Sequence, residues 1–265
     1  MTQPAVLVIA ATDSSGGAGL TRDVRVLADF GVDALCAVTA VTAQSDARVV
    51  GVHHVPPDIV RAQIAAALET RPVGAVKIGM LGDRATVEAV ADSLSGGAGA
   101  IGGAGIAAPI VVDPVLVSTS GGILLDAPGR AALLQRLIPL ATLVTPNVPE
   151  VAVLLGEAVA TDESGLIAQG RRLLEFGCRG ILLKGGHASG EEAVDLLVTS
   201  HGSVQRITSR RVSGSSRGTG CALASGIAAA LALGVPLLEA CRAAKGYVLE
   251  KMLTPEGIGA TTSSP

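Results

Sequence analysis

Gly218 to Cys221 form the stretch of this sequence whose residue types are best suited to chemistry. Gly218 and Gly220 allow the backbone to turn tightly and to approach a ligand, and the Ala/Leu-rich run 222–231 predicts a helix whose first N–H groups lack partners. With Thr219 between them, these N–H groups suit a phosphate or a developing oxyanion. Cys221 falls in the first turn, where a lowered thiol pKa is expected, so it is a candidate catalytic base. The alternative is a glycine turn before a buried helix, with Cys221 as a small core residue.

The elements that would position this loop are those of an α/β protein. Short apolar runs alternate with amphipathic segments, which predicts β-α units feeding a mainly parallel sheet. The predicted strands are 5–10, 34–42, 73–78, 110–113, 142–145 and 180–183, followed by a hairpin over 193–199 and 203–208. The predicted helices are 20–30, 57–68, 83–94, 130–137, 165–176, 219–233 and 236–252. Residues 1–265 are expected to form one domain, in which the Gly/Ala-rich segment 95–108 is a flexible surface insertion.

Polar or glycine clusters recur just after the predicted strands. They comprise Asp13 to Gly19, Gln44, Gly79-Met80, Asp113, Asn147 to Glu150, and Lys184 to His187. Because parallel strands place their carboxyl ends at one edge of a sheet, these clusters are expected to meet there. Together with the Gly218 loop, they would supply phosphate donors, carboxylates for a metal and polar groups for a ring. That combination suits phosphoryl transfer.

Composition favours a small-molecule enzyme. The net charge is −3, from 20 basic and 23 acidic residues, which gives no electrostatic footprint for nucleic acid or for an anionic membrane. The four cysteines contain no C-x-x-C pair, which argues against a metal-thiolate site. The apolar run 5–11 is too short for a signal peptide core or a membrane span, so a cytoplasmic location is expected.

Seven motifs, in this order, carry a resemblance that covers nearly the whole chain. They are 13–19 (DSSGGAG), 42–44 (TAQ), 76–81 (VKIGML), 113–115 (DPV), 145–150 (TPNVPE), 184–187 (KGGH) and 218–221 (GTGC). The sequence resembles the hydroxymethylpyrimidine/phosphomethylpyrimidine kinases of thiamine biosynthesis. The resemblance implies a ribokinase-like three-layer α/β/α fold with a mainly parallel central sheet, ATP, a magnesium ion and usually a homodimer. It also implies two phosphorylations, of 4-amino-5-hydroxymethyl-2-methylpyrimidine and then of its monophosphate.

The same resemblance implies roles for individual residues. Gln44 would hydrogen-bond the aminopyrimidine, since an amide can both donate to and accept from a heterocycle edge. Lys184 would lie near the nucleotide, and Cys221 takes the position where most ribokinase-like sugar kinases have an Asp base. The residues expected around the ring are Asp23, Ala11 and Met80. Those expected around the metal and phosphates are Asn147, Glu150 and Asp113.

Each motif alone has a simpler interpretation. Asn147 and Glu150 by themselves are more often helix-capping residues, since Asn opens helices and a Glu three positions on supports the cap. Asp113 before a proline is at least as often a turn former as a metal ligand. Gln44 could be a loop residue, and Lys184 a solvated lysine in a turn. The functional interpretation therefore depends on their occurrence together.

The chain departs from the family pattern at several positions. It has Ala11 for Gly, Ser14 for Pro, Thr21-Arg22 for Gln-Ala, Thr119 for Lys, and Ser215-Ser216-Arg217 for Asn-Thr-His. A methyl group at position 11 would narrow the approach of a ligand to the backbone, and Arg217 would place a permanent charge beside the phosphate loop. Three alternatives therefore stay open: a pyridoxal or pyridoxamine kinase on the same fold, a non-catalytic pyrimidine or nucleotide sensor, and a cysteine hydrolase using Cys221. The last lacks a basic partner in the sequence.

Overall fold

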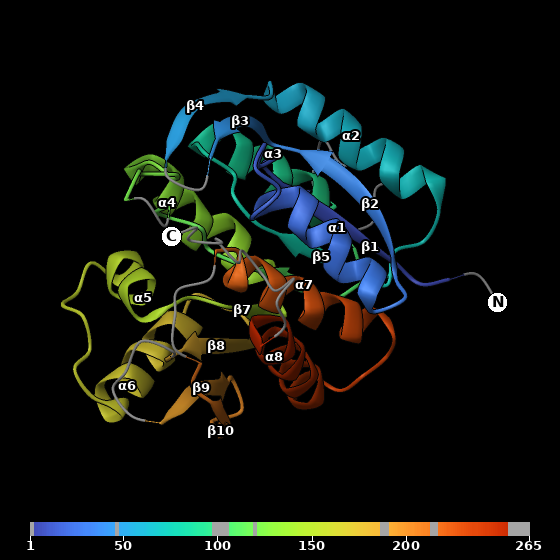
Figure 1. The fold of residues 1–265 in the computed structure, drawn as a ribbon. Helices are drawn as coiled ribbons and strands as arrows, with labels where there is room; N and C mark the ends of the chain where they lie inside the picture. Colours follow the sequence, from blue (N-terminus) through green and yellow to red (C-terminus); the bar gives the residue numbers. More distant parts are fainter. Residues whose placement is uncertain are drawn as a thin grey trace, which may run out of the picture.

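Strands buried on both faces form the centre of the molecule. The structure is a computed structural model that describes residues 3–45, 48–96, 106–118, 121–185, 191–212 and 217–253. Within these residues, eight strands form one sheet in the order β10-β9-β8-β7-β6-β5-β1-β2 (Figure 1). They are β1 (Ala5–Ala10), β2 (Asp33–Val38), β5 (Ala75–Ile78), β6 (Ile110–Val112), β7 (Leu143–Val144), β8 (Gly180–Lys184), β9 (Glu192–Thr199) and β10 (Val204–Arg210). Neighbouring strands among β2, β1, β5, β6, β7 and β8 pair in parallel, whereas β9 pairs antiparallel with both β8 and β10. This confirms the predicted mainly parallel sheet and the hairpin.

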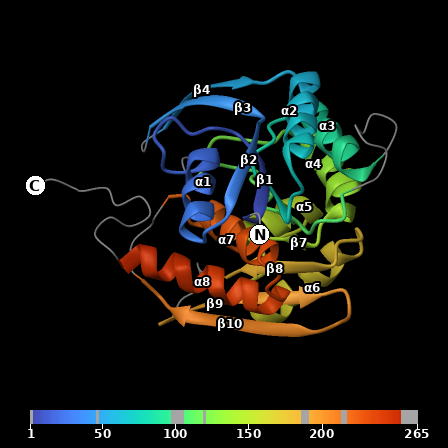
Figure 2. The ribbon, with the colours of Figure 1, turned by 90° about the vertical axis from the view of Figure 1, so that its right-hand side faces the viewer.

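Helices cover both faces of this sheet. They are α1 (Gly19–Asp29), α2 (Pro57–Thr70), α3 (Arg84–Ser95), α4 (Ala127–Ala132), α5 (Val148–Leu155), α6 (Glu163–Leu174), α7 (Thr219–Ala232) and α8 (Leu237–Leu253). Alternate residues of β1 point to opposite faces: Leu7 and Ile9 pack with α2 and α3, while Val6 and Val8 pack with α1, α7 and α8. Figure 2 shows these two helical layers on either side of the sheet. The architecture is therefore the predicted three-layer α/β/α sandwich. None of the described helices combines the length and apolar character needed to cross a membrane.

The strand predicted over 34–42 is wrong as one element. The chain leaves the main sheet at Thr39, and β3 (Ala40–Gln44) pairs instead with β4 (Val49–His54) in a separate two-stranded sheet. Thr39 is buried at the junction, where its hydroxyl donates to the Met80 carbonyl at 2.6 Å. The continuous apolar run of the sequence does not predict this tertiary hydrogen bond. Strand β4 was not predicted from the sequence; its residues are mostly exposed, with no alternation of buried and exposed positions.

Other boundaries differ by a few residues. The helix predicted over 130–137 begins at Ala127, where Asp126 caps α4, and its second half, Leu133–Leu137, winds as a π-helix. The predicted insertion 95–108 lies mostly outside the described residues. Its two described ends show that Ser95 closes α3 and that the Ile106 amide donates to the Leu94 carbonyl at 3.0 Å.

Candidate active site

The loops that follow the parallel strands meet at the start of α7. Gly218 precedes this helix with a φ of +77°, a left-handed conformation that favours glycine, and a side chain there would collide with the Gly17 carbonyl oxygen. A Cβ placed on Gly220 would lie 3.3 Å from Lys184 Nζ and 3.6 Å from Asp113 Oδ2. The first N–H groups of α7, Thr219 among them, therefore lie between the loop after β1 and the residues that end β6 and β8. The predicted gathering at the carboxyl edge is observed for these loops.

Lys184, Asp113 and Glu150 form a charged cluster beside this helix start. Lys184 Nζ donates to Asp113 Oδ1 at 3.0 Å and lies 4.0 Å from Glu150 Oε2. Thr145 Oγ1 donates to the same Asp113 oxygen at 3.2 Å. Burial raises the pKa of Glu150 to about 7, although the nearby Lys184 ammonium opposes that shift. When Glu150 is ionised, two carboxylates face one ammonium and leave a net negative charge, which suits a cation.

The capping interpretation of the Asn147-x-x-Glu150 motif is correct. Asn147 Oδ1 accepts from the Glu150 amide at 2.8 Å, and Glu150 Oε2 accepts from the Asn147 amide at 2.7 Å, a capping box at the start of α5. The same carboxylate oxygen faces Lys184, so capping leaves the Glu150 side chain at the charged cluster. Within the described part of the chain, no group of three or more His, Cys, Asp or Glu side chains could hold a metal. Asp113 and Glu150 nevertheless fit Mg²⁺, which usually takes one or two carboxylates and completes its shell with water and substrate phosphates.

Gln44 closes β3 on the other side of the Gly218 loop. Thr42 Oγ1 donates to Gln44 Oε1 at 3.4 Å, and the Gln44 backbone is held by Ser14. Ala11 is buried, and its carbonyl accepts from the Leu20 amide at the start of α1. Met80 is half-buried in the loop after β5. These three residues come from the loop or strand ends near the helix start, and their contact with a ring stays a prediction.

Asp23 lies deeper than the expected ring-enclosing position. Its side chain is fully buried: Oδ2 accepts from Lys77 Nζ at 2.6 Å and Oδ1 from Ser225 Oγ at 2.7 Å. Both oxygens are thus used within the protein, which makes Asp23 a support beneath the site. Although burial opposes the charge on Lys77, the facing carboxylates of Asp23 and Asp113 more than compensate and raise the Lys77 pKa above its usual value. A lysine inside the apolar strand 75–78 was the sequence signal for this ion pair, because a buried charge needs a partner.

The lowered pKa expected for Cys221 is wrong. Cys221 stands in the first turn of α7 and is half-buried. Burial raises the pKa of its thiol to about 11, although Lys77 opposes the shift. Asp23 and Asp113 add to the increase, since negative charges disfavour a thiolate. In the absence of ligands, Cys221 is therefore a protonated thiol at neutral pH.

Several of the positions that depart from the family pattern can be placed. Arg22 donates to the Gly17 carbonyl at 3.4 Å, and Arg217 pairs with Asp13 at 3.0 Å. Ser14 contacts the Gln44 backbone. Thr119, Ser215 and Ser216 lie outside the described residues, as do Gly186 and His187 of the motif 184–187.

Comparison with known proteins decides the family. Residues 13–264 match the phosphomethylpyrimidine kinase family. The chain belongs to this family of phosphotransferases. Among its relatives is a hydroxymethylpyrimidine/phosphomethylpyrimidine kinase from Rhizobium meliloti, which is 42% identical over 91% of this chain and 88% of that protein.

Solved structures agree with this family and with the predicted ribokinase-like fold. The phosphomethylpyrimidine kinase of Clostridium difficile is 33% identical, with a TM-score of 0.80 over 94% of this chain and 99% of its own. A pyridoxal kinase from Staphylococcus aureus, in complex with AMP-PCP and pyridoxal, has a TM-score of 0.83 at 26% identity over 95% of this chain and 88% of its own. The fold is thus shared by both kinds of kinase, while the higher sequence identities favour the pyrimidine kinases.

Proposed function

We propose that this kinase transfers the γ-phosphoryl group of ATP to 4-amino-5-hydroxymethyl-2-methylpyrimidine and then to the monophosphate of that pyrimidine. The observation that carries the proposal is the charged cluster of Lys184, Asp113 and Glu150, set against the backbone of Gly220 at the start of α7. A cation, two carboxylates and the N–H groups of a helix start at one point are the parts that phosphoryl transfer needs. The relatives' names supply the substrate class.

The proposed roles follow from charge and position. The N–H groups of Thr219 and its neighbours would donate hydrogen bonds to the transferring phosphoryl oxygens, and the Lys184 ammonium would neutralise part of their charge. Asp113 and Glu150 would hold Mg²⁺, with Asn147 fixing the Glu150 side chain through the cap. When bound, the ion would supply positive charge at the phosphate oxygens.

Cys221 would hold the hydroxymethyl oxygen and take its proton late. A thiol of pKa about 11 is a poor base at neutral pH, so an early proton transfer to it is unfavourable. Phosphoryl transfer proceeds through a loose transition state in which the attacking oxygen is only weakly bonded, and its proton becomes acidic late in the step. A buried thiol near two cations, Lys77 and Lys184, suits that timing.

The ring would bind between Gln44 and the loop after β5. The Gln44 side chain can donate to one ring position and accept from another, which matches an aminopyrimidine edge. Met80 is a flexible apolar side chain able to pack on a ring face. A pyridoxal ring presents a phenolic oxygen in place of this amino-nitrogen pattern, and Gln44 would discriminate between them.

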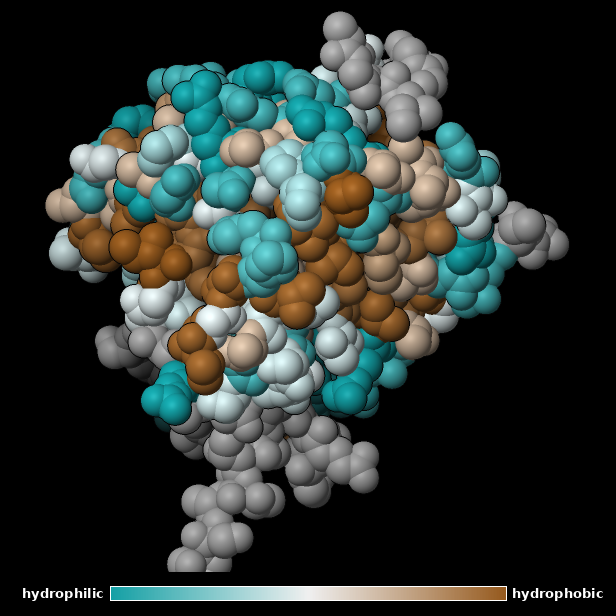
Figure 3. All heavy atoms as spheres, turned by 90° about the horizontal axis from the view of Figure 1, so that it is seen from above, coloured by the Kyte–Doolittle hydropathy of each residue, from teal (hydrophilic) through white to brown (hydrophobic). Residues whose placement is uncertain are grey.

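We also propose a homodimer through the face that carries β3 and β4. Val41, Val50 and Val52 of this two-stranded sheet are exposed, and Ile59 of α2 lies exposed as well. Figure 3 views this side of the molecule, where hydrophobic residues (brown) gather in a band across the face. Exposed apolar patches of this kind mark association sites in soluble proteins.

The test of the function is ADP release from the purified protein with ATP and Mg²⁺. The rings are offered one at a time: the hydroxymethylpyrimidine, its monophosphate and pyridoxal, with mass spectrometry of the products. Phosphorylation of both pyrimidines in preference to pyridoxal supports the proposal. Preference for pyridoxal would identify a pyridoxal kinase instead, and ring binding without any ADP release would identify a sensor.

A further inference from the structure

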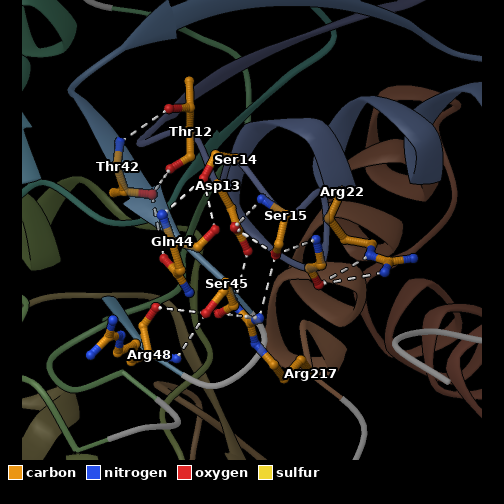
Figure 4. Close-up of polar contacts among 11 residues, drawn as sticks. Thr12, Asp13, Ser14, Ser15, Arg22, Thr42, Gln44, Ser45, Arg48 and Arg217 are labelled. Atoms are coloured by element: carbon orange, nitrogen blue, oxygen red, sulfur yellow. Dashed lines mark hydrogen bonds and ion pairs between the residues drawn. The ribbon is translucent and has the colours of Figure 1, made fainter. Parts of the chain in front are cut away.

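Arg217 joins three segments that are far apart in the chain. Its Nη2 donates to Asp13 Oδ2 at 3.0 Å, its Nη1 donates to the Ser45 carbonyl at 3.0 Å, and Nη1 also lies 3.4 Å from Ser15 Oγ (Figure 4). Asp13 and Ser15 belong to the loop after β1, and Ser45 follows Gln44 at the end of β3. Arg217 itself directly precedes Gly218. One guanidinium therefore connects the phosphate loop with the strand end that carries the proposed ring contact.

The Arg217–Asp13 pair is largely removed from water. The Arg217 side chain is 14% exposed and that of Asp13 is 3% exposed. The other Asp13 oxygen accepts from the Ser15 amide at 2.9 Å and from the Ser15 hydroxyl at 2.8 Å. An exposed ion pair contributes little, whereas a buried and fully hydrogen-bonded pair has a fixed geometry and leaves an unpaired charge when one partner is lost. This pair can therefore set the positions of the segments it joins.

Ser14 strengthens the same connection. Its hydroxyl donates to the Gln44 carbonyl at 2.7 Å and accepts from the Gln44 amide at 2.8 Å. Two residues earlier, the Thr12 carbonyl accepts from Thr42 Oγ1 at 2.8 Å. The loop after β1 is thus attached to β3 at two points, and Figure 4 shows these contacts together with the Arg217 guanidinium.

Ser14 and Arg217 both contact the segment that ends in Gln44 and Ser45. The Ser14 hydroxyl bonds the Gln44 backbone, and the Arg217 guanidinium donates to the Ser45 carbonyl. Their contacts meet at one place and bear on the position of Gln44 relative to the Gly218 loop.

We propose that Arg217, acting through Asp13 and the Ser45 carbonyl, is a positioning residue that sets the ring-binding end of β3 against the phosphate loop and so determines pyrimidine affinity. The inference rests on the proposed ring contact of Gln44. ATP would bind on the side of Lys184 and Glu150, whereas the Arg217 contacts described above are with Asp13, Ser15 and Ser45. The pyrimidine and the nucleotide should therefore respond differently to a change at position 217.

The kinetic test uses Arg217→Met, Arg217→Lys, Asp13→Asn and the double variant Asp13→Asn/Arg217→Met. Arg217→Met should raise the pyrimidine KM about tenfold and leave the ATP KM within about twofold, because displaced binding groups affect mainly the ligand they orient. Asp13→Asn should act similarly, the double variant should be no worse than the poorer single variant, and Arg217→Lys should recover part of the affinity. Equal changes in both KM values, unchanged kinetics, or a double variant that multiplies the two effects would each overturn the inference.

The matched control is Arg71→Met. Arg71 Nη1 pairs with Asp33 Oδ2 at 2.7 Å, an Arg–Asp pair between distant residues at the start of β2, away from the phosphate loop. It should leave both KM values unchanged. A pyrimidine KM that rises as much in this control as in Arg217→Met would show a general loss of stability instead.

A second measurement, the alkylation rate of Cys221, does not require substrate turnover. Iodoacetamide labelling of Cys221, followed by mass spectrometry, should be faster in Arg217→Met than in the wild type, while labelling of the exposed Cys36 provides the internal reference. Faster Cys221 labelling in a protein that phosphorylates no ring would support the link and refute the proposed function. Unchanged Cys221 labelling in all variants would refute the link itself.

Discussion

Cys221 combines a helix start, which favours a thiolate, with burial, which opposes one. A position at a helix N-terminus favours an anion by about 0.3–1 kcal/mol, and one pKa unit corresponds to about 1.4 kcal/mol. Loss of water can raise a buried acid's pKa by several units, so burial decides the sign. The pKa of about 11 follows, with the carboxylates of Asp23 and Asp113 acting in the same direction. A residue at the start of a helix thus need not be a reactive thiol.

The first residue-scale prediction concerns the pH dependence of Cys221 alkylation. Because the pKa is raised to about 11, the thiolate fraction is small at neutral pH and grows tenfold with each pH unit below that value. Labelling of the ligand-free protein by iodoacetamide should be slow at pH 7 and accelerate steadily toward pH 10. Mass spectrometry of the Cys221 peptide measures the rate. A rate that levels off below pH 8 would mean a lowered pKa and would restore the original expectation.

Replacing Cys221 separates the proton acceptor from the backbone donors. Cys221→Ala keeps the N–H groups of α7, so we expect kcat to fall on the order of 10²-fold, at the low end for a lost general base, with the ATP KM nearly unchanged. Cys221→Asp should recover some activity, since it supplies a carboxylate. Steady-state kinetics of the three proteins test this. Full activity in Cys221→Ala would leave the loop as an anion site alone.

Gln44→Leu tests the ring contact. Loss of paired hydrogen bonds should lower the pyrimidine kcat/KM on the order of 10²-fold, because unpaired polar groups in a binding site are costly. The ATP KM should hardly change. Gln205→Leu, at an exposed position of β10, is the matched control and should have wild-type kinetics. Equal losses of nucleotide and pyrimidine binding in Gln44→Leu would assign the residue a structural role.

At the scale of the element, α5 shows how a cap and a site can share one side chain. The capping box requires an oxygen on Glu150, and the proposed metal role requires its charge. The two requirements do not compete, because the oxygen that accepts from the Asn147 amide also faces Lys184. The start of α5 therefore holds a carboxylate at the charged cluster through the capping box itself.

Glu150→Gln separates the two roles of that side chain. A glutamine keeps an oxygen for the Asn147 amide and loses the charge, so the melting temperature should change little while the Mg²⁺ concentration for half-maximal rate rises. High Mg²⁺ should then restore part of the activity. Rates are measured across a Mg²⁺ series, beside a melting curve. An unchanged Mg²⁺ dependence together with a lower melting temperature would leave only the capping role.

At the scale of the whole molecule, β3 and β4 stand apart from the main sheet. They bring Gln44 to the site from outside the sheet and carry exposed valines on the same small unit. Figure 2 shows this pair of strands beyond the end of α1, with the main sheet below it. A dimer interface on β3 and β4 would restrict the motion of these two strands and so hold Gln44 in position.

The proposed dimer can be tested at that surface. Val50 lies on β4 and is 68% exposed. Because a charge at this position would be buried in the interface, Val50→Asp should shift the protein to a monomer, as measured by light scattering, and raise the pyrimidine KM. Val159→Asp, at another exposed valine, should leave the mass unchanged. A wild type that is monomeric at all concentrations would contradict the proposal directly.

The sequence by itself determined those features that local pattern encodes. The uninterrupted apolar run of β1 predicted a strand buried on both faces, and the glycine loop before an Ala/Leu run predicted the start of α7. The ordered motifs predicted the family, because their residue types and order are readable without coordinates. Ring, nucleotide and metal contacts stay predictions.

Tertiary structure decided what depends on surroundings. Thr39 bonds the Met80 carbonyl where the chain leaves the sheet, Lys77 pairs with Asp23 54 residues away, and Arg217 pairs with Asp13 204 residues away. The Cys221 pKa follows burial rather than its place on a helix. In each case the deciding energy is desolvation or a hydrogen bond between distant segments. A local pattern reports the periodicity of its own segment, and only the folded chain brings together the partners that set these energies.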